Sequence, residues 1–291
     1  MIATAEAYAK LNLSLDIVSK MSDGYHSLKT VMRSISLCDD ITIECVPGEN
    51  VSVESNLPYL PDDERNIAAK AARAFFKYTG IEGLHTRIRI NKRIPVCAGL
   101  GGGSTDGACV LRLLDKMLDT GLGQKTLKTI GGSIGSDVPF CIAGGTMLAE
   151  GRGDRLTGLT PIPQCHIVIC KPTFSCSTPE LFRRVRCEKI RARPDTEGIV
   201  AALEESDLIG IARRMYNVFE DVLPRGARDI ADIKNAMHDN GALGAVMTGS
   251  GPAVFGLFED VTHAEKAHEQ LKMSYKDCFL SETTGQDGIR S

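Results

Sequence analysis

Five glycines fall within nine residues of this chain, and this cluster constrains its fold more than any other feature. Residues 95–107 read PVCAGLGGGSTDG, and the glycines are Gly99, Gly101, Gly102, Gly103 and Gly107. Without Cβ atoms such a backbone curls tightly and comes close to a ligand. A helix is expected over 105–118, with Ser104, Thr105 and Asp106 as good N-cap residues. We predict a phosphate-binding loop, because a helix N-terminus attracts anions and a plain turn needs fewer glycines.

The common nucleotide-binding motifs do not describe this loop. No glycine of the cluster precedes a lysine at Walker A spacing, and Ser104 replaces the third glycine of a dinucleotide fingerprint. The H-R-D and D-F-G elements of protein kinases are missing from the sequence. Residues 131–135 match the G-x-S-x-G of hydrolases, but a helical pattern precedes them where a strand is required. Ser133 is therefore not expected to be a nucleophile.

Length and composition fit a two-domain globular enzyme. The chain has 291 residues and a formal charge of −3, which argues against a nucleic-acid partner. Its ten cysteines include no C-x-x-C spacing, so we expect reduced thiols. The sequence shows no secretory signal and no segment near the ~20 apolar residues of a membrane span. We therefore expect a cytoplasmic protein without a membrane partner.

Hydrophobic periodicity places the elements of the first half. Residues 5–17 alternate between apolar and polar side chains, as in a strand with one buried face. Segments 41–46 and 51–55 flank PGEN and are interpreted as a hairpin. A helix over 66–79 is expected to end at Gly80, and a strand over 86–90 follows.

The second half mixes helices and strands without regular alternation, which favours an α+β fold. A Gly-, Pro- and charge-rich stretch suggests domains at 1–155 and 156–291. Strands are predicted at 166–171, 244–247, 253–258 and 278–280, and helices at 179–186, 196–205, 207–222, 226–239 and 263–273.

Several polar residues are candidates that mean little in isolation. Lys10 and Asn12 share the polar face of the first strand, where a solvated lysine is the ordinary explanation. Asp137 precedes Pro139 in a Gly/Ser loop and could simply be a turn or cap residue. The TGSGP segment at 248–252 fits either a close backbone approach or a turn.

Three segments together resemble the motifs of the GHMP small-molecule kinases, which include galactokinase, homoserine kinase and mevalonate kinase. They are AYAKLNLSLDI, PVCAGLGGGSTDGA and MTGSGPAVFGLF, and the similarity runs from residue 7 to about 258. KLNL at 10–13, DGYH at 23–26 and GSDVPF at 135–140 resemble the branch acting on a cytidine diphosphate-linked methylerythritol. That branch belongs to the non-mevalonate route of isoprenoid synthesis. The family's Asn-Asp-aromatic-Glu segment differs here, so Asn217 and Glu220 receive no role.

The resemblance implies a fold, a reaction and a set of site residues. The fold is a ribosomal-S5-like N-terminal domain with a ferredoxin-like C-terminal domain. The reaction transfers the γ-phosphoryl group of ATP, with Mg²⁺, to the 2-hydroxyl of the methylerythritol. Asp137 would accept the hydroxyl proton, and Lys10 would hold Asp137 ionised. The ATP phosphates would lie in the loop formed by Pro95, Val96, Cys97, Ala98, Gly99, Leu100, Gly101, Gly102, Gly103, Ser104 and Thr105.

Other residues would hold the metal and the substrate. The same resemblance suggests Ser104 as a Mg²⁺ ligand and places Asn12 near the reacting hydroxyl. The cytidine pocket would contain Tyr25, His26, Thr178 and Phe182, with Phe174 as the alternative to Phe182.

Two alternatives remain at this point. Another GHMP kinase, of homoserine or mevalonate type, is disfavoured because Tyr25 and Phe182 suit a flat base better than a polyol. A non-catalytic binding protein of the same fold would be expected to lack the Lys10–Asp137 pair. The oligomeric state is left open by the sequence.

Overall fold

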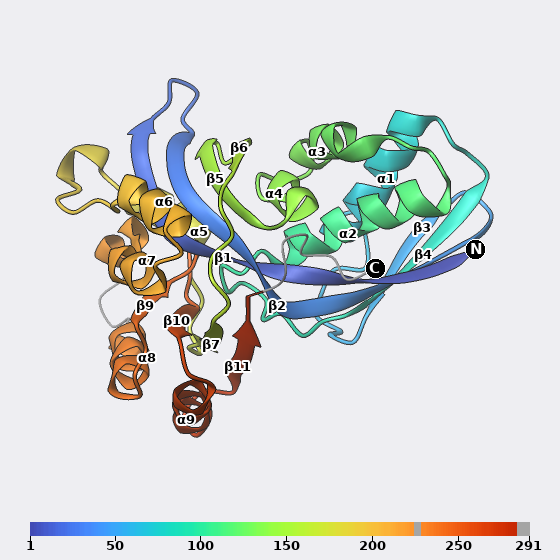
Figure 1. Cartoon of the computed structure of the whole chain (residues 1–291). Helices are drawn as coiled ribbons and strands as arrows, with labels where there is room; N and C mark the ends of the chain where they lie inside the picture. Colours follow the sequence, from blue (N-terminus) through green and yellow to red (C-terminus); the bar gives the residue numbers. More distant parts are fainter. Residues whose placement is uncertain (224–227, 284–291) are drawn as a thin grey trace.

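The computed structural model describes residues 1–223 and 228–283, and its strands form two sheets (Figure 1). The first sheet has the order β3-β4-β2-β1-β8, with β5 paired to β2 and β6 to β5. Its strands are β1 (Ile2–Lys20), β2 (His26–Pro47), β3 (Val51–Ser55), β4 (Leu84–Asn91), β5 (Thr146–Gly151), β6 (Arg155–Gly158) and β8 (Tyr216–Asn217). The long antiparallel pair of β1 and β2 runs through the molecule and connects its two ends (Figure 1).

The predicted first strand is confirmed and is longer than the alternating segment. β1 starts at Ile2 and ends at Lys20, and its apolar positions are buried from Ala7 to Ile17. The predicted helix over 66–79 is α1 (Ile67–Thr79). Asn66 caps its first turn, and Gly80 ends it in the left-handed conformation at φ 69°.

The predicted hairpin of 41–46 with 51–55 is wrong. Both segments are strands, but β3 pairs in parallel with β4, and β4 pairs antiparallel with β2. β4 therefore lies between the two expected partners. The parallel pair is connected through α1 as a crossover, and local alternation shows that strands exist without showing which strands are neighbours.

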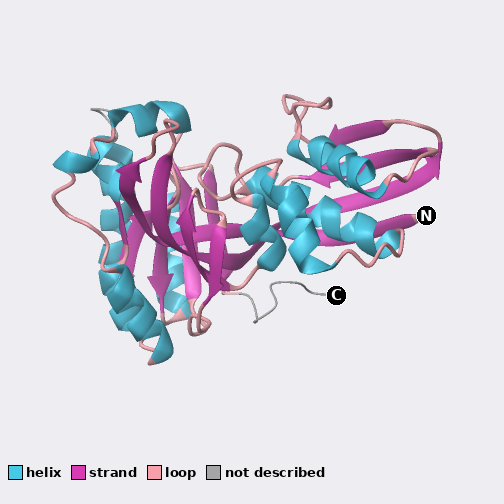
Figure 2. Ribbon diagram, turned by 90° about the horizontal axis from the view of Figure 1, so that it is seen from above, coloured by secondary structure: helices cyan, strands magenta, loops and turns pink. Residues whose placement is uncertain are grey.

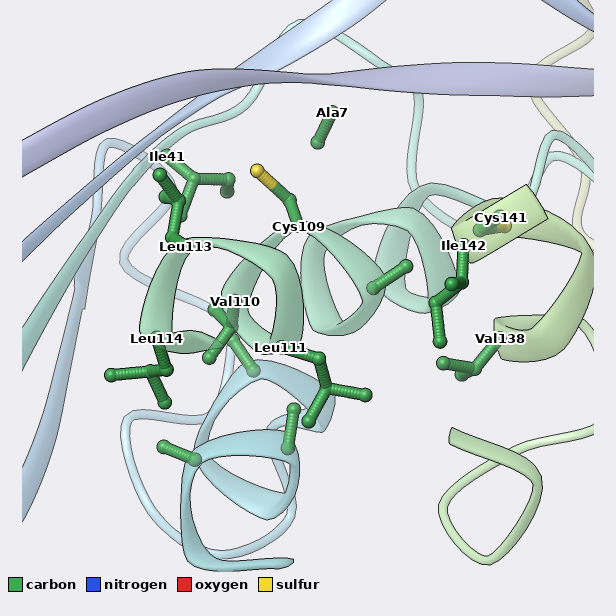
Figure 3. Packing of buried hydrophobic residues seen from close by; sticks show 14 of the residues in the cluster. Ala7, Ile41, Cys109, Val110, Leu111, Leu113, Leu114, Val138, Cys141 and Ile142 are labelled. Atoms are coloured by element: carbon green, nitrogen blue, oxygen red, sulfur yellow. The ribbon is translucent and has the colours of Figure 1, made fainter. Parts of the chain in front are cut away.

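A hydrophobic core lies between the first sheet and the helices on one of its faces. α1 and α2 (Gly102–Met117) contact the sheet, and α3 (Gly123–Gly132) and α4 (Val138–Ala143) pack against these helices. Figure 3 shows Cys109 of α2 directed toward Ala7 of β1, while Leu111 lies on the side of Ile142 of α4. α2 is therefore held from both sides, which fixes the loop that enters it.

The second sheet lies at the opposite end of the molecule from the N-terminus (Figure 2). Its order is β11-β7-β10-β9, and every pair is antiparallel. The strands are β7 (His166–Lys171), β9 (Gly244–Met247), β10 (Val254–Phe258) and β11 (Asp277–Glu282). α8 (Arg228–Asp239) and α9 (Val261–Lys272) pack on this sheet, and α5 (Thr178–Arg184), α6 (Thr196–Glu204) and α7 (Leu208–Arg214) complete the second half. The predicted α+β class is confirmed.

The predicted helix over 207–222 is wrong in its second part. α7 ends at Arg214, and the chain then forms β8 and a 3₁₀ turn at Val218–Val222. β8 pairs in parallel with β1, where Ser14 lies opposite Tyr216. The Asn217 side chain accepts a hydrogen bond from the Phe219 N–H at 3.0 Å, a local contact that competes with helix continuation.

The proposed boundary at residue 155 falls in the β5–β6 hairpin, where β6 begins. β6 belongs to the first sheet, and β8 brings the second half back to it. The division at 155 therefore stays a prediction. Within residues 1–223 and 228–283, no helix combines the length and apolar character needed to cross a membrane.

Candidate active site

The glycine loop leads into α2, and no side chain caps the N-terminus of this helix. α2 begins at Gly102, and its N-cap is Gly101 in the left-handed conformation at φ 72°. Ser104, Thr105 and Asp106, predicted as caps, lie inside the first turns, so that prediction is wrong. Thr105 Oγ1 donates instead to the Tyr8 carbonyl at 2.7 Å. The first N–H groups of this 16-residue helix therefore remain available to an anion.

Other segments of the protein approach the glycines of the loop closely. A Cβ on Gly99 would lie 2.1 Å from the Thr248 carbonyl oxygen, and one on Gly101 would lie 2.8 Å from Lys10 Cγ. A Cβ on Gly102 would meet the Lys92 Nζ at 3.1 Å. Gly99 and Gly101 therefore require glycine, because a Cβ there would overlap neighbouring segments, whereas a Cβ on Gly102 would make only a tight contact. Close packing explains these two glycines, and the uncapped end of α2 is the candidate anion site.

Lys10 lies at the centre of the site, although its pattern predicted a solvated side chain. It is only 4% exposed, because the glycine loop covers this part of β1. Its Nζ donates to Asn12 Oδ1 at 2.6 Å and lies 3.8 Å from Asp137 Oδ2. Asn12 Nδ2 in turn donates to Thr30 Oγ1 at 2.8 Å. The structure thus brings the predicted Lys10, Asn12 and Asp137 together.

Asp137 combines this ion pair with access to solvent. It occupies the N-cap position of the short helix α4, but its side chain caps no N–H group there. Its side chain is 37% exposed, against 5% for that of Lys10. A carboxylate with one buried cationic partner and one side open to solvent can accept a proton from a hydroxyl group placed there.

The third sequence motif closes the site from the second half. Thr248 Oγ1 accepts a hydrogen bond from the Asn12 N–H at 3.0 Å and lies 3.4 Å from the Gly99 carbonyl oxygen. Asn217 Nδ2 donates to the Gly249 carbonyl at 2.8 Å and thereby supports this turn. Sequence reasoning gave Thr248 and Asn217 no role. The signals were the TGSG segment and the incomplete family match around Asn217.

A cavity of about 950 Å³ lies beside Asp137. Residues 132–136, which precede Asp137, line it together with the β1–β2 turn, the β5–β6 turn and α5. Three predicted residues, Tyr25, His26 and Phe182, are among its lining. The site therefore continues from the Lys10–Asp137 pair into a cavity whose lining includes these three rings.

The predicted pocket rings come from both halves of the chain, with His26 in β2 and Phe182 in α5. The rings of His26 and Phe182 stack on each other, with centroids 5.1 Å apart at 25°. Burial and the nearby Lys20 lower the pKa of His26, which favours its neutral ring at pH 7. Phe174 and Phe182 both pack against the same hydrophobic cluster, but only Phe182 is among the residues that line the cavity. Whether Phe182 or Phe174 contacts the base stays a prediction.

Thr178 lies next to the cavity but is not among the residues that line it. Its Oγ1 is hydrogen-bonded to Ser250 Oγ at 2.6 Å, and its neighbour Pro179 lines the cavity. Its role in substrate binding stays a prediction.

Sequence reasoning missed a buried charge cluster beneath α2. Lys92 Nζ lies 2.5 Å from Asp39 Oδ2 and 2.8 Å from Asp106 Oδ2. Asp39 Oδ1 also accepts the N–H groups of Arg93 and Ile94, at the entry of the glycine loop. Burial, opposed by Lys92, raises the pKa of Asp106 to about 7. The available signal was a lysine shortly before the glycine cluster and an aspartate within it.

The predicted Mg²⁺ ligand, Ser104, does not belong to the group of residues whose spacing would suit a metal ion. Ser104 lies partly exposed in the first turn of α2. Among the described residues, Glu6, Cys38 and Asp40 form the group with suitable ligand spacing. Arg93 already donates to Cys38 Sγ at 3.2 Å and to Asp40 Oδ1 at 2.6 Å. Burial also raises the pKa of the Cys38 thiol to about 11, so this group is a poor metal site.

Comparisons with known proteins agree with these observations. The family model described as "GHMP kinases N terminal domain" matches residues 66–145, and "GHMP kinases C terminal" matches residues 199–277. A 4-diphosphocytidyl-2-C-methyl-D-erythritol kinase of Clostridium botulinum (strain Eklund 17B / Type B) is 42% identical over 96% of this chain and 99% of its own. The protein of that name from Caldicellulosiruptor bescii is 42% identical over 98% of this chain and 99% of its own.

Solved structures show the same fold. A crystal structure of 4-(cytidine 5'-diphospho)-2C-methyl-D-erythritol kinase superposes with a TM-score of 0.82 at 32% identity, covering 97% of this chain and 100% of that one. A homoserine kinase from Cytophaga hutchinsonii gives 0.73 at 21% identity, covering 99% of this chain and 96% of its own. The latter likeness concerns the fold alone.

Proposed function

Because this chain belongs to the GHMP kinases, we propose that it phosphorylates the 2-hydroxyl of 4-diphosphocytidyl-2-C-methyl-D-erythritol with ATP. Relatives about 42% identical over nearly the whole chain are named as kinases of this compound. The observation that carries the proposal is the Lys10–Asp137 pair beside a chamber lined by Tyr25, His26 and Phe182. The ammonium–carboxylate pair suits transfer to a hydroxyl, and the aromatic chamber suits a nucleobase.

The N-terminus of α2 is the proposed binding site for the ATP phosphates. Its uncapped N–H groups and its dipole favour negative charge at this point. The close packing of Gly99 and Gly101 holds the loop against Thr248 and Lys10. Mg²⁺, when bound, would offset the charge of the phosphates, and Ser104 in the first turn is the residue we propose to hold it.

We propose that Asp137 Oδ2 accepts the proton of the substrate hydroxyl that is phosphorylated. Lys10 lies 3.8 Å from this oxygen, and its ammonium positions the carboxylate beside the acceptor hydroxyl. Asn12 orients the Lys10 ammonium through its Oδ1 at 2.6 Å. Phosphoryl transfer mainly requires positioning and charge stabilisation, so these contacts supply what the reaction needs from the protein.

The cytidine end of the substrate is proposed to lie in the aromatic chamber. Tyr25 offers a ring at the cavity wall, and the stacked His26 and Phe182 form another apolar surface. A neutral His26 ring carries one donor and one acceptor, which suits the polar edge of a base.

A substrate panel tests the function directly. The purified enzyme would be given ATP and, separately, 4-diphosphocytidyl-2-C-methyl-D-erythritol, mevalonate, homoserine and galactose, and ADP release would be measured. We expect turnover above background with the cytidine substrate alone. Turnover with mevalonate or homoserine and none with the cytidine compound would overturn the proposal in favour of another GHMP kinase.

A further inference from the structure

Two surface turns meet at the mouth of the cavity through three side chains. The Arg152 guanidinium, on the β5–β6 turn, lies 4.3 Å from the centroid of the Tyr25 ring. It also forms an ion pair with Asp23 Oδ2 on the β1–β2 turn. The other carboxylate oxygen of Asp23 accepts the Tyr25 N–H at 3.0 Å. Asp23, Tyr25 and Arg152 therefore form a closed ring of contacts.

We propose that Arg152, tethered by Asp23, is a positioning residue that holds the Tyr25 ring in place for the base of the substrate. This inference rests on the proposed function. Tyr25 is 60% exposed, and a ring so exposed would otherwise move among several rotamers. An arginine stacked on one face of the ring restricts it and leaves the opposite face for a planar ligand.

The main-chain hydrogen bonds of the β1–β2 turn support a positioning role for Arg152. Gly24 N–H donates to the Met21 carbonyl at 3.1 Å, and Met21 N–H donates to the Tyr25 carbonyl at 2.7 Å. These bonds fix the main chain of the turn but leave the Tyr25 side chain unconstrained. Arg152 supplies the missing constraint, and Asp154 anchors Arg152 by accepting its backbone N–H at 3.0 Å.

Arg152 could instead bind the substrate diphosphate directly, and the two roles make different predictions. A residue that acts through Tyr25 loses its effect once the ring is gone. A residue that binds the diphosphate keeps its effect in that background. A double-mutant cycle of Arg152→Met and Tyr25→Ala therefore separates them.

The experiment measures CDP affinity by calorimetry, and the KM values for the cytidine substrate and for ATP. We expect Arg152→Met to weaken CDP binding by about two- to thirtyfold, the range of a cation–π contact. The KM for the cytidine substrate should rise in parallel, while kcat and the KM for ATP stay within about twofold. Arg152→Lys should restore part of the loss. Arg155→Met, at an exposed arginine of the same hairpin, is the matched control.

The outcomes distinguish positioning of Tyr25 from direct binding of the diphosphate by Arg152. If Arg152→Met has no effect in the Tyr25→Ala background, the positioning role holds. An equal effect in both backgrounds overturns it in favour of direct diphosphate binding. Tighter CDP binding by Arg152→Met also overturns it, since the base would then need the face that Arg152 covers. Wild-type enzyme that neither binds CDP nor uses the cytidine substrate would refute the proposed function itself, and this inference with it.

Discussion

At the residue scale, Lys10 connects all parts of the site. Its main chain binds the glycine loop through the Leu100 carbonyl at 3.0 Å, and its ammonium lies between Asn12 and Asp137. A buried ammonium with these partners has little freedom, so it holds the Asp137 carboxylate in one place. Removing either member of the pair should therefore affect chemistry more than binding.

Asp137→Asn should lower kcat by about 10²–10⁴, the usual contribution of a general base. ATP affinity should change little, because the α2 N-terminus is untouched. Lys10→Ala should fall in the same range, and the double variant should lose little more than either single one. Steady-state kinetics and ATP titration test this, with the exposed Asp62→Asn as control. Near-normal turnover of Asp137→Asn would remove Asp137 as the base.

Asp106 should make stability depend on pH. Its pKa is raised from 3.8 to about 7 in the fold, chiefly by burial. Between about pH 4 and pH 7 the folded state keeps a proton that the unfolded state has released, so stability falls as pH rises. Asp106→Asn removes this titration. Urea unfolding at pH 5 and pH 8 should show the variant gaining stability relative to wild type at pH 8; an equal difference at both values would contradict the shift.

Lys92→Met should destabilise the protein by about 3–5 kcal/mol, because it leaves the Asp39 and Asp106 carboxylates buried without their cation. Urea unfolding measures the loss. Lys70→Met, at an exposed position of α1, is the control and should change stability by less than about 0.5 kcal/mol. A similar small loss for Lys92→Met would show that the cluster contributes nothing to the fold.

Site residues could be predicted from the sequence where they belong to a family motif. Lys10, Asn12 and Asp137 were chosen through the family resemblance, and the structure brings them together. Their burial was not predictable, because alternation along β1 identifies a polar face without showing that the glycine loop covers it. Arg152 and Lys92 were missed for the same reason. Their partners lie on other elements, and no local pattern reports such distant pairs.

At the element scale, the approach of the glycine loop to the second half determines which glycines can change. A Cβ on Gly99 would overlap the Thr248 carbonyl, and its φ of 80° disfavours any side chain. A Cβ on Gly103 would meet only the end of the Ile67 side chain, at 3.1 Å. The two glycines look alike in sequence and differ in surroundings.

Gly99→Ala should therefore lower the melting temperature strongly or prevent folding, whereas Gly103→Ala should leave it within a few degrees. Gly103 lies in α2, where alanine is the better helix former, and this offsets part of the contact. Differential scanning fluorimetry compares the two. Equal tolerance of both substitutions would show that the loop can move away from Thr248.

Elements with strong local signals were predicted well. α1 has its Asn66 cap and Gly80 stop in the sequence, and its bounds agree with the prediction within one residue. The hairpin error at 41–55 and the helix error at 207–222 have a common origin. In both cases a strand distant in sequence, β4 or β1, provides the pairing partner that local periodicity does not contain.

At the scale of the whole molecule, the two halves share a hydrophobic core. One buried cluster contains Leu11 and Ile35 of the first half with Ile167 and Phe255 of the second. A separate cluster, which includes Leu114, is built from the first half alone. The shared cluster and the β1–β8 pairing couple the halves, so the predicted division at 155 does not imply independent stability.

Unfolding should therefore be a single transition in calorimetry. Leu11→Ala, in the shared cluster, and Leu114→Ala, in the first-half cluster, should each cost about 2–5 kcal/mol because each removes a fully buried side chain. In a coupled molecule both variants shift the same peak, and the calorimetric and van't Hoff enthalpies agree. The exposed Met273→Ala is the control and should leave the peak in place. Two peaks, of which Leu114→Ala moves only one, would show instead that the halves unfold independently despite the core they share.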